Sequence, residues 1–245
     1  MLVSKSFEKR KSIIFLFFGL AILAACIPSG DDETKGKYEF VVNRYEIGEH
    51  VLHIPYAYTR FHLTSVGGES GLIQAYYPGS SPVIQGTENL RESGKYVNRV
   101  HILFTDLKRY QGFDPKKSLQ GAVDHFAATE LAGQEFGLTK LTQAKGVPNP
   151  DYKDELWIAS EPSTEIVYIS CSKEARAPAP QCKHKFYDDK FLYSVTYDKR
   201  QLKNWATIRD NVIELMHSFR SAEAAEEFVR EKFYETYFEQ MGEKP

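Results

Sequence analysis

Hydrophobic and polar residues alternate in many short segments of this chain, which is the pattern of strands that are half buried in a sheet. A clear example is the segment 191–198 (FLYSVTYD), in which an aromatic or aliphatic residue occupies every second position. Turn-forming Gly, Pro, Asn and Asp residues separate such segments from one another. The predicted strands are 38–44, 49–54, 61–64, 71–77, 96–106, 155–159, 165–171, 183–188 and 191–198.

Three other segments place apolar residues along one side of a helix, which predicts amphipathic helices. They are 118–136, 199–219 and 222–240. The clearest is 199–219, whose apolar positions are Leu202, Trp205, Ile208, Val212, Leu215 and Phe219. In 118–136, the apolar positions near one face are Leu119, Val123, Phe126 and Leu131. Asp198 precedes the helix 199–219 and is its predicted N-cap.

The order of these elements indicates the fold class. Strands occur in runs with helices between the runs, which favours an α+β fold over a doubly wound parallel sheet. We therefore expect a mainly antiparallel sheet, or sheets, with two or three packed helices. The stretch 134–154 is rich in Gly, Pro and Lys. It suggests a subdivision near 137–154 into two similar halves, although no sequence repeat supports one.

The N-terminal segment predicts export from the cytoplasm. Four basic residues among the first eleven precede an uncharged run, 12–25 (SIIFLFFGLAILAA). As a helix this run would reach about 21 Å, short of the ~30 Å hydrocarbon core, so a secretory signal is favoured over a membrane span. Its end, Leu23-Ala24-Ala25-Cys26, resembles the lipobox of bacterial lipoproteins. The resemblance implies that residues 1–25 are removed and Cys26 is lipidated; the alternative is an ordinary cleavage site beside a chance cysteine.

The residues after Cys26 refine this prediction. Position 27 is Ile rather than Asp, and the lipoprotein resemblance then implies sorting to the outer membrane. The segment 26–37 is short and mostly polar and contains glycine, which is typical of a flexible tether. The domain organisation that we expect is a signal peptide (1–25), a tether (26–37) and a globular domain (38–245).

Composition and charge exclude several classes of protein. The 245 residues include 42% hydrophobic and 13% aromatic residues, enough for a globular core and too many for a disordered chain. The net charge of −2 and a pI near 6.4 provide no basic footprint for nucleic acid. Loss of residues 1–25 leaves 27 basic and 32 acidic residues, a net charge of −5. That charge is compatible with a basic protein partner.

Two cysteines remain after Cys26 is assigned to lipid. Cys171 and Cys182 flank a segment that is rich in small residues and Pro, typical of an excursion between two strands. An oxidising compartment favours a disulfide between them. The alternative is that one cysteine is a nucleophile assisted by His184, but no third, orienting group is evident.

The candidate catalytic and metal motifs are weak. Gly68-Glu69-Ser70-Gly71 approximates a nucleophile elbow, but the second glycine comes one position early and the segment precedes a strand, so a hairpin turn is favoured. His50 and His53 would point to opposite faces of a strand, and no metal-ligand spacing is present. No glycine-rich phosphate-binding motif occurs. We therefore predict no enzymatic activity, no metal and no cofactor.

Two blocks of sequence resemble a known family. One combines HIPYAY (53–58) with IQAYYP (73–78), and the other combines LYSVTY (192–197) with LKNWATI (202–208) near Cys182. Together with the lipobox, they resemble periplasmic lipoprotein immunity proteins that neutralise phospholipase toxins of type VI secretion systems. The resemblance implies a toxin partner, no chemistry of the chain's own, and inhibition by occlusion of the toxin's active site.

Two alternatives stay open: an envelope-assembly or ligand-binding lipoprotein, and a periplasmic hydrolase in which Ser70 is the first candidate nucleophile. If the immunity interpretation is right, we expect exposed turns to contact the partner, because binding residues concentrate on loops that rigid strands hold. The turns are 64–71, 172–181 and 143–154, and the predicted contact residues are Glu69, Ser70, Tyr152, Lys173, Glu174 and Arg176.

Overall fold

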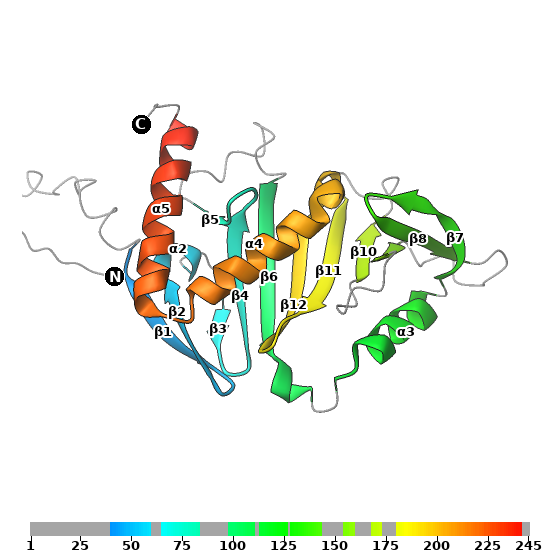
Figure 1. The fold of residues 1–245 in the computed structure, drawn as a ribbon, viewed down its shortest axis with the longest axis horizontal. Helices are drawn as coiled ribbons and strands as arrows, with labels where there is room; N and C mark the ends of the chain where they lie inside the picture. Colours follow the sequence, from blue (N-terminus) through cyan, green and yellow to red (C-terminus); the bar gives the residue numbers. More distant parts are fainter. Residues whose placement is uncertain are drawn as a thin grey trace, which may run out of the picture. The chain divides into compact units, whose positions relative to one another are not determined.

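One long antiparallel sheet forms the centre of the fold (Figure 1). The computed structural model describes residues 40–59, 65–83, 98–110, 113–126, 128–143, 154–159, 168–172 and 180–241. These residues belong to one compact unit, Lys37–Pro245. In spatial order the strands are β3 (Ser65–Gly67), β4 (Ser70–Tyr76), β6 (Arg99–Asp106), β12 (Phe191–Asp198), β11 (Gln181–Tyr187), β10 (Tyr168–Ser172), β9 (Asp154–Ala159), β8 (Leu138–Gln143) and β7 (Ala128–Glu135), and β5 (Ser81–Pro82) pairs with β4.

Neighbouring strands in this sheet pair antiparallel throughout. The sheet, with the helices packed on it, confirms the predicted α+β class. The spatial order of the strands differs from their order in the chain. The strand β6 lies between β4, an early strand, and β12, the last of the described strands. The strand before residues 144–153, β8, pairs with the strand after them, β9, so both belong to the same sheet.

A separate hairpin is formed by β1 (Val42–Ile47) and β2 (His50–Pro55). Its two-residue turn begins with Gly48 at φ +58°, a backbone conformation that favours glycine. The one-turn helix α2 (Tyr56–Thr59) follows β2, and helix α5 (Ala222–Met241) packs against β1, β2 and β5. The β2 amide of His53 donates a hydrogen bond to the carbonyl of Phe219 (2.6 Å), which connects the hairpin to the chain just before α5.

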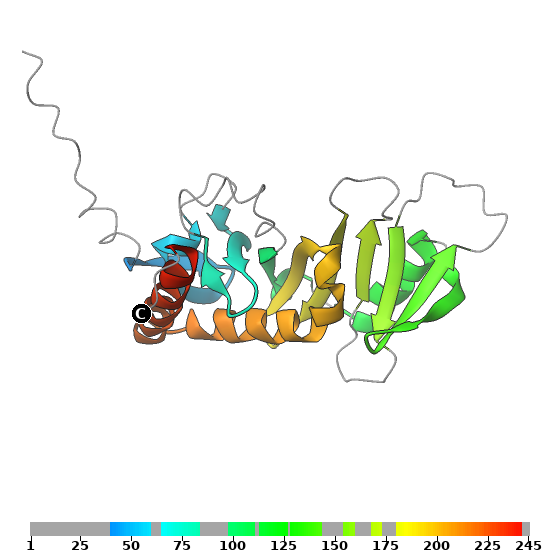
Figure 2. The same ribbon diagram turned by 90° about the horizontal axis from the view of Figure 1, so that it is seen from above.

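The helix with the strongest sequence pattern lies across the sheet. Asp198 accepts a hydrogen bond from the Arg200 amide (2.9 Å) and caps the 3-10 helix Lys199–Asn204, which leads into α4 (Trp205–Ser218). Figures 1 and 2 show α4 crossing one face of the sheet over β4, β6, β12 and β11. Five of the six predicted apolar positions are buried there, and Trp205 packs partly buried against the same core. The core residues that the central strands contribute on this face include Ile73, Ile102 and Val195.

The predicted helix 118–136 is wrong in its second half. Helix α3 (Pro115–Phe126) ends ten residues early, and 128–135 is β7, which forms a hairpin with β8. Phe136 and Gly137 turn the chain with φ +56° and +74°, and Gly133 also has a positive φ, which is incompatible with a continuing helix. Leu131, placed on the apolar helix face by its spacing, is 78% exposed. Strand pairing with β8 therefore outweighs a weak helical pattern.

The remaining predicted strands agree with the structure to within a few residues at their ends, except 61–64, which lies outside the described residues. The predicted helix 222–240 corresponds to α5. A short 3-10 helix, Leu107–Arg109, follows β6. None of the described helices is both long and apolar enough to cross a membrane.

Candidate functional site

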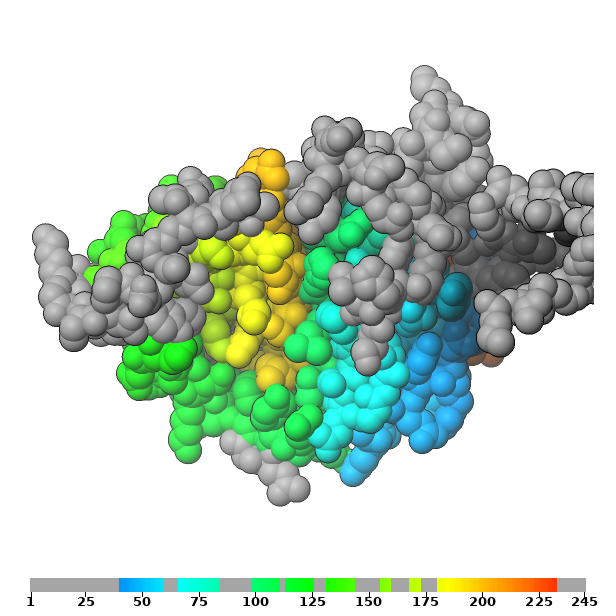
Figure 3. Space-filling model, turned by 180° about the vertical axis from the view of Figure 1, so that it is seen from behind, coloured from blue at the N-terminus to red at the C-terminus, as the bar shows by residue number. Residues whose placement is uncertain are grey.

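The two faces of the sheet differ in character. Along β11, Cys182, His184 and Phe186 point to the α4 side and are buried, whereas Lys183 and Lys185 alternate with them and point to the opposite side. The same alternation runs through the neighbouring strands. We call this opposite side the open face; its residues over β10–β12 include Tyr168, Ser170, Ser172, Gln181, Lys183, Lys185, Tyr187, Leu192, Ser194 and Thr196. Figure 3 shows this side of the molecule, with the atoms of β11 in yellow.

Helix α3 borders the open face. Trp157 and Ile169 belong to the core beneath α4, but their chain neighbours Leu156 and Tyr168 pack with Ala122 of α3 in a second, smaller core. Because side chains alternate along a strand, α3 lies on the other side of the sheet from α4. On one side of the sheet, α4 covers β4, β6, β12 and β11, and on the other side α3 covers the β7–β10 end.

A groove of about 610 Å³ lies between α3 and the uncovered strands. Its described lining residues are Ser118, Gly121, Ala122 and His125 of α3, Tyr168, Ser170 and Ser172 of β10, Gln181, Cys182, Lys183 and Lys185 of β11, and Thr196 of β12. We call it the basic groove, because its described lining contains two lysines and no carboxylate. The Lys185 ammonium lies 5.6 Å from the centre of the Tyr168 ring, a cation–π arrangement.

A disulfide joins Cys171 and Cys182 at the edge of this groove. The two residues are directly opposed in the β10–β11 pair, and both are fully buried. The ends of the connection that it closes, Ser172 and Gln181, line the basic groove. The disulfide therefore fixes the base of one of the predicted contact loops.

The same bond removes the cysteine-nucleophile alternative, because a disulfide leaves no thiolate. His184, the suggested base, is fully buried among the rings of Phe186, Tyr197 and Trp205, and both of its ring nitrogens lack a hydrogen-bond partner among the described residues. Burial, and then the charge of Arg209, lower the pKa of His184 to about 3. His184 is therefore a neutral core residue at ordinary pH.

Two predicted contact residues, Glu69 and Ser70, lie together at one tip of the sheet. The Glu69 carboxylate forms an ion pair with Arg109 (2.9 Å), and its carbonyl accepts the Asp106 amide (2.9 Å). Ser70 begins β4 opposite Thr105. A serine hydrolase requires a hydrogen bond between its serine and a histidine, and Ser70 forms no such bond with a histidine of the described residues. Neither residue lines the basic groove. Cys26, Tyr152, Lys173, Glu174 and Arg176 lie outside the described residues.

Of the described lining of the basic groove, the predicted contact turn 172–181 included its two ends, Ser172 and Gln181. Lys183 and Lys185 were missed, although β11 carries a usable signal. In QCKHKF, polar Gln181, Lys183 and Lys185 alternate with residues of the core. That pattern indicates a strand with one solvated, basic face. What the sequence does not show is that α3, some sixty residues earlier, forms the other wall.

In one cluster of possible metal ligands, the carboxylates bind an arginine side chain of the protein. Ligand atoms of Asp188, Asp189 and His217 lie within 4.8 Å of one another. Arg220 donates to both carboxylates, at 3.0 and 2.9 Å. Burial opposes ionisation of Asp189, but hydrogen bonding and the charge of Arg220 hold its pKa below the usual range. The cluster is therefore a structural ion-pair network.

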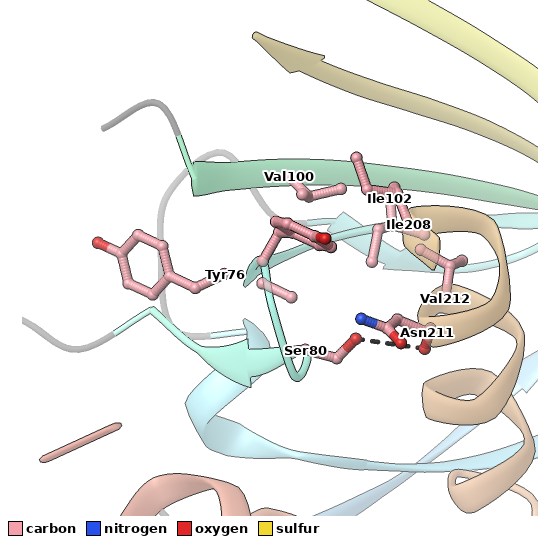
Figure 4. A pocket seen from close by; sticks show the side chains of 9 residues that line it. Tyr76, Ser80, Val100, Ile102, Ile208, Asn211 and Val212 are labelled. Atoms are coloured by element: carbon pink, nitrogen blue, oxygen red, sulfur yellow. Dashed lines mark hydrogen bonds between the residues drawn. The ribbon is translucent and has the colours of Figure 1, made fainter. Parts of the chain in front are cut away.

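A second cavity lies between β4–β6 and α4 (Figure 4). It measures about 10 Å³ and is lined mainly by apolar side chains, including Val100, Ile102, Ile208 and Val212. The Ser80 hydroxyl donates to the carbonyl of Asn211 at 3.2 Å across one side of it. This volume is at the lower limit for one water molecule, so the cavity is too small for a lipid or other organic ligand.

The fold places this chain among α+β proteins built on a long antiparallel sheet crossed by a helix. In its structure it is similar to Smlt3025, an immunity protein of the Stenotrophomonas maltophilia type IV secretion system, with a TM-score of 0.56 and 19% identity over 74% of this chain and 94% of that chain. The Neisseria meningitidis iron-regulated outer membrane lipoprotein FrpD matches with a TM-score of 0.44 and 11% identity over the same shares. No protein-family model and no curated protein matches the sequence.

Proposed function

We propose that this chain is a periplasmic immunity protein, anchored to the outer membrane through Cys26, that binds a toxin of a secretion system and occludes the toxin's active site. The observation that carries the proposal is the fold shared with an immunity protein over 94% of that protein's length. The predicted signal peptide and lipobox support it, because a protector must be in the compartment that the toxin enters.

The architecture suits inhibition by occlusion. Stable inhibitors present a preformed surface, since ordering a flexible surface on binding reduces affinity. Here the sheet, α4 and the Cys171–Cys182 disulfide hold the open face rigidly. A lipid tether confines the protein near the membrane, which raises its effective concentration towards a toxin that acts there.

The nature of the toxin is a finer part of the proposal. A phospholipase delivered by a type VI system is what the resemblance of the two sequence blocks implies. In the structure these blocks belong to β2, α2, β4, β12 and α4, which are elements of the scaffold. The resemblance therefore rests mainly on residues that maintain the fold, although Thr196 of the second block lines the basic groove. The choice of partner then depends mainly on surface residues outside the blocks.

The decisive experiment uses the secreted protein encoded beside this chain as the candidate toxin. It is directed to the periplasm of a susceptible bacterium, with and without the full-length chain. We expect the toxin alone to arrest growth and to deplete membrane phospholipid, and the chain to restore both. Purified chain should abolish hydrolysis of phospholipid vesicles when equimolar with the toxin. Absence of binding and protection would overturn the proposal.

The anchor is tested separately with Cys26→Ser behind an ordinary cleavable signal peptide. This variant should bind the purified toxin as the wild type does, because the lipid takes no part in the contact. It should be released with the soluble periplasmic fraction and should protect cells less well at low expression, since the tether no longer concentrates it at the membrane. Membrane association that survives the substitution would contradict lipid anchoring at Cys26.

A further inference from the structure

Resting on this proposed function, we propose that the basic groove receives an acidic loop of the toxin, whose carboxylates pair with Lys183 and Lys185. Glu69 and Ser70, at the tip of the sheet, take no part in this contact. The argument rests on charge, on the chemistry of the groove lining and on the rigidity of its walls.

The charges of the groove are uncompensated within the described part of the protein. Elsewhere lysines meet carboxylates: Lys108 pairs with Glu49, and both Lys140 and Lys199 pair with Glu155 at 2.8 and 3.0 Å. In contrast, neither Lys183 nor Lys185 forms an ion pair with any carboxylate of the described residues. Two adjacent lysines in a concave site, neither paired with a carboxylate of the described residues, attract a negatively charged partner group.

The lining chemistry favours a protein loop over a small organic ligand. Small-molecule pockets are mostly apolar with a few polar groups. Here hydroxyls from three elements converge: Ser118 on α3, Ser170 and Ser172 on β10, and Thr196 on β12. Hydroxyls both donate and accept, so they can satisfy the backbone and carboxylates of an inserted peptide. A groove of about 610 Å³ has room for several side chains.

The walls of the groove are preformed. Three interior strands of the sheet supply its floor, and α3 is fixed by the small core around Leu156 and Tyr168. The Tyr168 ring lies 5.6 Å from the Lys185 ammonium, a cation–π contact that favours this position of the side chain. Binding there orders few protein groups, which is what a tight inhibitory contact requires.

The test compares charge reversals in the purified mature chain against the toxin encoded beside it. The double variant K183E/K185E should raise Kd by about 100-fold at low salt, because two close charge pairs become repulsive. The matched control K190E/K203E makes the same change of net charge outside the groove and should change Kd by less than about threefold. The melting temperatures of the three proteins are measured as well, because Lys190 lies near the Asp189 carboxylate and Lys185 over the Tyr168 ring, and Kd is compared at a temperature at which all three are folded.

The outcomes separate the two proposals. If wild type and K183E/K185E bind the toxin equally well, the groove assignment is overturned and the immunity function stands. If the wild type does not bind, the immunity function itself fails, and the groove assignment with it. A direct confirmation is rescue: an Asp→Lys or Glu→Lys change in one toxin loop should restore binding to K183E/K185E and weaken binding to the wild type. If inorganic phosphate shifts the groove resonances while charge reversal leaves toxin binding unchanged, the groove is a site for a free anion instead.

Discussion

The Arg220 guanidinium donates a hydrogen bond to the Asp188 carboxylate at 3.0 Å across 32 residues of sequence. Asp188 also accepts from the Tyr193 hydroxyl (2.8 Å) and from the amides of Lys190 and Phe191 (2.8 and 2.7 Å). One carboxylate thereby shapes the β11–β12 turn and connects it to the residues that follow α4. Although the sequence places Asp188 in a turn, its side chain is only 8% exposed.

Asp188→Ala should lower the free energy of unfolding by about 3 kcal/mol, because it leaves several donors, one of them charged, without an acceptor. Urea denaturation followed by circular dichroism measures the loss. The control is Asp189→Ala: this carboxylate is 65% exposed, and solvent screens its pair with Arg220, so the loss should be below about 1 kcal/mol. Equal losses in the two variants would contradict the structural role of Asp188.

The buried imidazole of His184 predicts a dependence of stability on pH. Its pKa is about 3 in the folded state, whereas an unfolded histidine takes up its proton near pH 6.5. Between these values the unfolded state binds more protons, so the free energy of unfolding should fall as the pH is lowered from about 6.5 towards 3. The total loss from this residue is on the order of 4 kcal/mol.

His184→Leu should flatten this dependence, because leucine does not titrate and fills a similar volume. Denaturation curves at several values of pH between 7 and 4 test it. The matched variant is His125→Gln on the exposed surface of α3, which removes an imidazole and leaves the buried core unchanged. A slope that is unchanged in His184→Leu would show that other groups control acid unfolding.

Removal of the disulfide by Cys171→Ala with Cys182→Ala should affect both stability and binding. In the chain-entropy account, a crosslink that closes a loop of this length contributes about 3 kcal/mol to the free energy of unfolding. Because Ser172 and Gln181 line the basic groove beside the crosslink, toxin affinity should also fall. Wild-type protein treated with a reductant should reproduce both effects. A variant that loses stability but keeps full affinity would place the toxin contact away from this edge.

The sequence predicts elements well where local pattern and packing agree. The helix 199–219 and its cap at Asp198 follow from periodicity and from capping chemistry, and both are present. The segment 128–136 fails because its few apolar residues fit a helix face, while its strand structure depends on pairing with β8. Local pattern carries no information about that pairing.

The candidate site is less predictable than the fold for the same reason. The basic groove combines α3 with β10, β11 and β12, and only the sheet order places them together. Turn composition directed the prediction to Glu69 and Ser70, which are at the tip of the sheet. Alternation in β11 shows that Lys183 and Lys185 share a face, but not that a helix encloses that face.

In the turn of the first hairpin, Gly48 lies close to the side chain of Asp106, a residue far from it in the sequence. A Cβ atom on Gly48 would lie 1.6 Å from the Asp106 carboxylate oxygen, and the backbone there has φ +58°. Asp106 accepts hydrogen bonds from the amides of Glu49 (3.2 Å) and Lys108 (2.9 Å), so displacing its carboxylate would break both. Gly48→Ala should therefore lower the free energy of unfolding by about 3 kcal/mol, combining backbone strain with lost hydrogen bonds.

Gly68→Ala is the matched control, because Gly68 has nearly the same backbone angle, φ +65°, and nothing within 4 Å of the added Cβ. That variant should lose only the strain of a left-handed alanine, about 1 kcal/mol. Chemical denaturation of both variants measures the difference, which isolates the contact with Asp106. Asp106→Ala combined with Gly48→Ala should then cost less than the sum of the two single losses, since each change disrupts the same hydrogen bonds. Additive losses would show that the hairpin turn and Asp106 stabilise the fold independently.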